Sequence, residues 1–194
     1  MRSTQLTRSR GRLTLAVALA TFSLACGGSD PTSSTAPAVP LIPAGTAQAP
    51  LVSADAGGTG GVSVTTKAIP DGYFDANISV HLVNGRPSTT YVVQRAPDVA
   101  RALGNDGVCQ RALGIAPWSS ADPAAPAFVT FLQPDGTTPF TVATSATGEG
   151  SLTFEFKVPT VPAGTKFDVM FRLLNDLTSP TSVFQSSCFT VTVL

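Results

Sequence analysis

The feature that most constrains the fold is a strict alternation of apolar and polar side chains along three segments. Residues 74–82 read FDANISVHL, in which every second side chain, beginning with Phe74, is apolar. Residues 152–158 and 167–173 repeat the pattern. Since successive side chains of a strand point to opposite faces, each segment predicts a strand with one buried face. Weaker patterns of the same kind occupy residues 62–67, 89–95, 127–132, 140–144 and 189–194.

Turn sequences rich in Gly, Pro, Asn and Asp separate these segments, as in PDG at residues 70–72 and 134–136. About seven to nine short strands, each with one apolar face, need a second layer of sheet to cover them. We therefore expect an all-β domain over residues 62–194, built as an antiparallel β-sandwich. A closed barrel is the alternative architecture.

Two strand entries carry a resemblance to a known architecture. The segments NGRPSTTYVVQ (84–94) and VPAGTKFDVMFRL (161–173) each place a Pro/Gly turn before an aromatic residue and an alternating strand. They resemble strand entries of fibronectin type III and immunoglobulin-like domains. The resemblance implies an immunoglobulin-like sandwich, although the Cys…Trp…Cys spacing of immunoglobulin domains is not present.

One region departs from the strand pattern. In residues 95–107, Asp98 is placed as an N-cap, Val99, Ala102 and Leu103 follow at helical spacing, and Gly104 is a stop signal. We expect one short helical insertion between strands here.

The start of the chain carries a targeting signal. Four arginines precede an uncharged run over residues 13–25, which is too short to span a hydrocarbon core of about 30 Å but fits the apolar region of a signal peptide. Ser23, Leu24, Ala25 and Cys26 occupy the positions of a lipobox, so the segment resembles a bacterial lipoprotein signal. The resemblance implies removal of residues 1–25 and acylation of Cys26. An ordinary secretory peptide with a coincidental cysteine is the alternative.

The lipoprotein resemblance also implies an address. Several acyl chains, at about 0.8 kcal/mol per buried methylene, anchor a protein firmly to a membrane. Gly27 follows the cysteine, where an Asp is associated with retention at the inner membrane, so we expect the outer membrane in a Gram-negative cell. Residues 26–61 are rich in Pro, Gly, Ser and Thr and predict a disordered linker of about 30 Å average span.

The other two cysteines predict a disulfide. With Cys26 assigned to the lipid, Cys109 and Cys188 remain as an even pair in an exported domain. A bridge would close a loop of about 80 residues and stabilise the fold by about 4 kcal/mol in the chain-entropy model. Free buried thiols, or a metal site shared with His81, are the alternatives.

Charge and motifs exclude several classes of function. The chain has 12 basic and 12 acidic residues, and without the four leading arginines 8 basic residues remain, so no nucleic-acid-binding surface is indicated. We find no nucleophile-elbow, phosphate-binding loop or metal-binding motif, and the single histidine, His81, falls on the polar face of a predicted strand. The sequence indicates no cofactor and no metal, and we expect a protein that is not an enzyme.

The loop aromatics Trp118 and Tyr73 are the candidate ligand-binding residues, because an exposed aromatic ring can stack on a sugar or anchor a protein. We expect a lipid-anchored cell-envelope protein that presents a β-sandwich for binding or surface structure, with a membrane and an unknown protein or glycan as partners. The alternatives are a carbohydrate-binding module that uses these aromatics and, less favoured, a small envelope hydrolase that uses His81.

Overall fold

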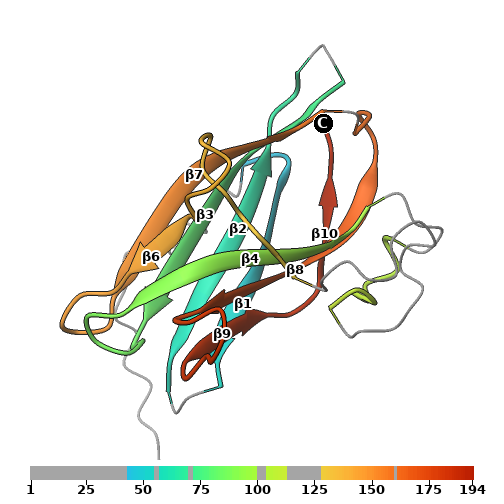
Figure 1. Ribbon diagram of the computed structural model, residues 1–194. Coiled ribbons are helices and arrows are strands. Elements are labelled where there is room, and N and C mark those ends of the chain that lie inside the picture. Colours follow the sequence, from blue (N-terminus) through green and yellow to red (C-terminus); the bar gives the residue numbers. More distant parts are fainter. Residues whose placement is uncertain (1–42, 55–56, 70–71, 100–103, 113–127, 160) are drawn as a thin grey trace, which may run out of the picture. The chain divides into compact units, whose positions relative to one another are not determined.

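The computed structural model describes residues 43–54, 57–69, 72–99, 104–112, 128–159 and 161–194. These residues form an all-β structure without helices (Figure 1). The strands are β1 (Thr46–Ser53), β2 (Thr59–Thr66), β3 (Phe74–Val83), β4 (Thr90–Asp98), β5 (Val129–Thr130), β6 (Thr141–Ala143), β7 (Gly150–Val158), β8 (Lys166–Leu174), β9 (Val183–Ser186) and β10 (Phe189–Thr192).

The ten strands belong to one antiparallel sheet. Its main path runs β5-β4-β8-β9-β1-β2-β3-β7, while β6 pairs with β4 and β10 pairs with β8. Because β9 pairs with both β8 and β1, hydrogen bonds continue from one flank of the sheet to the other. The structure thus differs from the expected immunoglobulin-like sandwich, in which two separate sheets face each other.

The sheet covers its own apolar face by curling. Strands β4 and β8 cross over the face formed by β1, β2 and β3 (Figure 1). The ring of Phe74 in β3 packs edge-on against Phe167 in β8, with 5.5 Å between ring centroids, although three other strands separate β3 from β8 along the path. A single hydrophobic core fills the space between the two flanks.

The ends of the path are also joined through the chain itself. Strand β6 pairs with β4 near one end, and a turn in which the N–H of Ser145 donates to the carbonyl of Glu149 leads from β6 into β7 at the other end. The sheet therefore forms a half-barrel around the core, an arrangement between the predicted sandwich and its closed-barrel alternative.

The alternation in the sequence is confirmed where it is strongest. In β3 the side chains of Ala76, Ile78, Val80 and Leu82 are buried, and β7 and β8 occupy the two other segments that alternate clearly. Asp168 in β8 is an exception, because it is fully buried where a solvent-facing residue is expected. Its carboxylate accepts hydrogen bonds from the N–H of Gly107 (2.7 Å) and the hydroxyl of Thr190 (2.6 Å), which satisfies the buried charge.

The helical insertion is not found among the described residues. The N-cap role predicted for Asp98 is wrong, because Asp98 is the last residue of β4 and pairs with Asp168 in β8. Strand β4 continues beyond the point where the helix was expected, because it pairs with β8 as far as Asp98. Residues 100–103, which held the rest of the helical pattern, lie outside the described residues.

The region expected to be linker contains part of the domain. Residues 46–53 form β1, which pairs with β2 along seven positions and with β9 along three. Ala49 and Leu51 are the buried side chains of β1. Proline and small residues make the alternation in this strand too weak to recognise from sequence, and its stability comes from pairing on both sides.

Candidate functional site

Of the two predicted ligand-binding aromatics, only Tyr73 belongs to the residues that the structure describes. Tyr73 lies just before β3 with 45% of its surface exposed, while Trp118 lies outside the described residues, as does the lipidation candidate Cys26. Tyr91, in β4, is fully buried, and its hydroxyl lies 3.0 Å from the hydroxyl of Ser182 and accepts from the N–H of Arg86. Tyr91 is therefore part of the core and not of a binding surface.

Cys109 and Cys188 are joined by a disulfide, with 5.7 Å between their Cα atoms. This geometry agrees with the pairing expected from the cysteine count, and it leaves no thiol for the alternative metal site with His81. No group of three or more His, Cys, Asp or Glu side chains that could hold a metal ion occurs among the described residues. The bond fastens residues 104–112 to the chain just before β10.

His81 lies on the outer face of β3 in a shallow hollow that we call the outer groove. The hollow measures about 700 Å³, and its outward-facing side chains are small or polar: Gln48, Pro50, Ser63, Ser79, His81, Ser151 and Thr153. His81 pairs across the strands with Ser151, but none of the described residues that line the groove is a carboxylate. A serine nucleophile activated by a histidine that a carboxylate orients is thus not assembled here.

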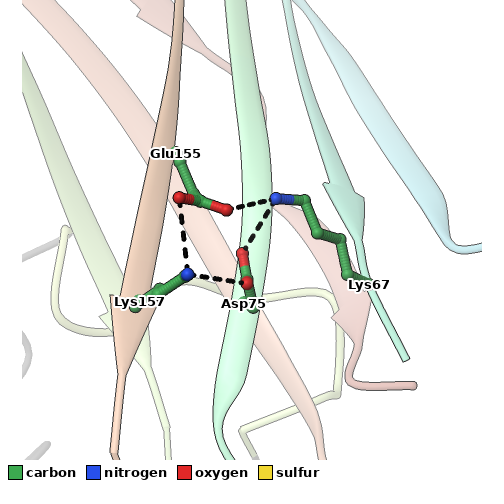
Figure 2. Close-up of polar contacts among 4 residues, drawn as sticks. All are labelled: Lys67, Asp75, Glu155 and Lys157. Atoms are coloured by element: carbon green, nitrogen blue, oxygen red, sulfur yellow. Dashed lines mark hydrogen bonds and ion pairs between the residues drawn. The ribbon is translucent and has the colours of Figure 1, made fainter. Parts of the chain in front are cut away.

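Four charged side chains form a network on the same outer face, nearer the other end of the strands. Figure 2 shows Lys67 and Lys157 each contacting both Asp75 and Glu155. Asp75 is nearly buried, with 6% of its side chain exposed, and its two oxygens lie 3.3 Å from Lys67 Nζ and 3.4 Å from Lys157 Nζ. Opposite charges alternate around the network, so it is internally neutral.

The network shifts the protonation of its exposed members. The hydrogen bond between Lys67 and Glu155 raises the pKa of Lys67 and lowers the pKa of Glu155, while desolvation opposes both shifts. Each shift favours the charged form, which is the form that pairs. The network therefore ties β3 to β7 and to the residue that follows β2, and it leaves no charge available for chemistry.

The interior of the half-barrel holds the second candidate, a cavity of about 410 Å³ that we call the Arg95 cavity. Among the described residues that line it, Arg95 is the only one that is not apolar, and these residues come from both flanks of the sheet and from neighbouring loops. The residues are Val64, Phe74, Ile78, Arg95, Pro97, Val99, Phe131, Phe156, Val158, Val161, Phe167, Val169, Phe171 and Val191. Pro97, Val99, Phe156 and Val158 are partly exposed, so the cavity reaches the surface at this end.

The alternation of β4 directs Arg95 into the cavity. Tyr91 and Val93 are buried core residues, and Arg95 is the next position on the same face of the strand. Its guanidinium carbon lies 4.3 Å from the ring centroid of Phe131 and 4.4 Å from that of Phe156. These two rings are nearly perpendicular, with 89° between their planes, so the guanidinium occupies the corner between them.

Arg95 carries its charge in an unfavourable environment. Burial, with a smaller contribution from the positive charge of Arg111, lowers the pKa of its guanidinium to about 10. Within the part of the chain that the structure describes, no carboxylate, carbonyl or hydroxyl group accepts a hydrogen bond from the Arg95 side chain. The ring faces offset part of the cost of burial but do not replace strong acceptors for its N–H groups.

Arg95 was not among the site residues predicted from the sequence. The weak pattern over residues 89–95 ended the predicted strand at Arg95, where a charged residue reads as a strand end. The alternation of β4 could have identified it. Side chains two residues apart lie on the same face of a strand, so an arginine two residues after the buried Val93 points into the core if the strand continues.

No helix in the described residues is long and apolar enough to cross a membrane. Comparisons of the chain with protein-family models, with curated proteins and with solved structures gave no match.

Proposed function

We propose that the chain is a lipid-anchored cell-envelope protein whose β-domain binds a small apolar ligand in the Arg95 cavity. The observation that carries the binding role is the cavity itself, about 410 Å³ within walls that are almost wholly apolar. Ligand sites are typically cavities of about 300–1,000 Å³ with apolar walls and few polar groups. Protein interiors otherwise pack as densely as organic crystals, so a cavity of this size in a small domain supports a role in ligand binding.

The anchor is the second part of the proposal. The run of residues 13–25 and the lipobox ending at Cys26 support acylation of that thiol and a position at the outer membrane. An acylated N-terminus would hold the β-domain near a membrane, which is a source of apolar ligands. Binding is favoured over catalysis because the two hollows described above offer no nucleophile with an oriented base.

A pair of tryptophan variants tests the cavity. Val158→Trp adds an indole at the partly exposed end of the Arg95 cavity, while Thr153→Trp adds one to the exposed outer face of the same strand. With 1-decanol as the probe, titration calorimetry should give saturable binding to wild type and to Thr153→Trp. Val158→Trp should bind at least tenfold more weakly. Equal binding to all three proteins, or none to wild type, would show that the cavity is not a ligand site.

Metabolic labelling tests the anchor. Cells that express the full chain are grown with an alkyne analogue of palmitate, and the label on wild type is compared with the label on Cys26→Ser. We expect label on wild type only, together with an acylated N-terminal peptide that begins at Cys26 in the mass spectrum. An unlabelled wild type that is cleaved at another residue would point to an ordinary secretory signal.

A further inference from the structure

We propose that the Arg95 cavity selects a single-chain amphiphile with a carboxylate head, which Arg95 holds by paired hydrogen bonds while the apolar tail fills the cavity. This inference rests on the proposed function and adds the chemical class of the ligand. Three observations support it: the position of the guanidinium between two rings, the absence of a hydrogen bond from its side chain to a described residue, and its place as the one charged side chain among the described residues that line the cavity.

The two phenylalanine rings fix the position of the Arg95 guanidinium. Phe131 and Phe156 approach Arg95 with their ring faces, at 4.3 and 4.4 Å from the guanidinium carbon. Ring faces are weak acceptors, so these contacts hold the guanidinium in place without giving its N–H groups strong hydrogen bonds. The N–H groups of Arg95 can therefore still bind a stronger acceptor in the cavity.

The lack of an acceptor makes these N–H groups a site for an anion. Within the described residues Arg95 has ring contacts but no hydrogen bond or ion pair from its side chain. Arg95 is partly buried, and a carboxylate matches the fork of its guanidinium with two parallel N–H···O bonds. A ligand carboxylate would supply both the missing acceptors and the missing negative charge.

The charge of the cavity favours a ligand head group with a single negative charge. Arg95 is the one charged side chain among the described residues that line the cavity, so the cavity offers a single positive charge to a ligand head. Transfer of a dianion from water into apolar walls costs more than transfer of a monoanion, and one guanidinium neutralises only one charge. A carboxylate thus fits better than a phosphate monoester. Val64, Ile78 and Val191 would contact the tail.

The test compares heads of different charge on the same ten-carbon tail. Titration calorimetry at pH 7 measures binding of decanoate, 1-decanol and decyl phosphate to the full-length chain. Wild type should bind decanoate at least tenfold more tightly than 1-decanol and more tightly than decyl phosphate. Arg95→Met should lose this preference and retain 1-decanol binding, which would also show that the variant is folded.

A matched arginine provides the control. Arg172 lies on the opposite face of the neighbouring strand β8, where its side chain donates to Gln94, so Arg172→Met should keep the preference for decanoate. Binding of 1-decanol without preference for decanoate would overturn the carboxylate assignment and leave the proposed function standing. Tighter binding of decyl phosphate would overturn it as well. Absence of binding by all three probes would remove both the assignment and the proposed function.

Discussion

Replacement of Arg95 by methionine should stabilise the protein, although it removes a charge and two ring contacts. Burial and the charge of Arg111 lower the pKa of Arg95 to about 10. A base with a lowered pKa in the folded state binds its proton less tightly there than in the unfolded chain. Its charge therefore destabilises the fold at every pH below about 10, and the penalty disappears as the pH rises from there towards the ordinary pKa of an arginine.

The size of the effect follows from these values. At about 1.36 kcal/mol for each pKa unit, the charged guanidinium costs about 3 kcal/mol at pH 7. The contacts with Phe131 and Phe156 return about 0.5–1 kcal/mol each. Methionine is flexible and apolar enough to fill the same space. We therefore expect Arg95→Met to raise the free energy of unfolding by about 1–2 kcal/mol and the melting temperature by about 3–6 °C.

Urea unfolding of the full-length chain, followed by far-ultraviolet circular dichroism at pH 7, measures this effect without ligand. Arg172→Met serves as the comparison, because its guanidinium donates two hydrogen bonds to Gln94, at 3.0 and 2.7 Å. Loss of these bonds should lower stability by about 1 kcal/mol, so the two arginine variants should change stability in opposite directions. If Arg95→Met also lowers stability, the guanidinium is a structural contact and its placement gives no reason to expect a ligand.

Three other variants test the fold. Gly148→Ala should lower the free energy of unfolding by about 2 kcal/mol or more, because Gly148 has a φ of 81° and an added Cβ would lie 2.2 Å from the carbonyl oxygen of Gly85. An unchanged midpoint in urea would contradict this close approach of the two backbone segments. Replacement of both Cys109 and Cys188 by alanine should cost about 4 kcal/mol through loss of the long loop closure. Two reactive thiols in the unfolded, unreduced wild type would show that this bond does not form. Glu155→Gln should lower the melting temperature slightly at pH 7 and low salt, and the difference from wild type should shrink in 1 M NaCl. The difference in melting temperature should also shrink as the pH falls below 4.5. The hydrogen bond with Lys67 lowers the pKa of Glu155, and the stability that this contact contributes is lost as the carboxylate protonates. A difference that persists at pH 2 would contradict the role of the charge.

The strands with one fully apolar face could be predicted from sequence because burial alone fixes their pattern. Ile78 and Val80, for example, are buried as the alternation of β3 requires. The short strands β5 and β6 appear within segments that were only weak candidates. Strand β1 was assigned to the linker, since Ala49 and Pro50 carry little apolar signal and its stability comes from partners distant in sequence.

The closure of the sheet and the candidate site depended on long-range pairing. Alternation along a strand does not specify which strands become neighbours, so it could not distinguish a sandwich from a sheet that continues through β9. Asp168 was expected to face solvent and is buried by the segment that contains Gly107. Arg95 was read as a strand end, and only the continuation of β4 to Asp98 turns its side chain into the core.

The most direct test of the account is to locate a bound ligand. Methyl-labelled full-length chain is mixed with decanoate, and nuclear Overhauser effects are measured between the acyl chain and protein methyl groups. We expect contacts with Val64, Ile78 and Val191, which line the Arg95 cavity. Contacts confined to residues of the outer groove, or none at saturating decanoate, would contradict the assignment of the cavity as the ligand site.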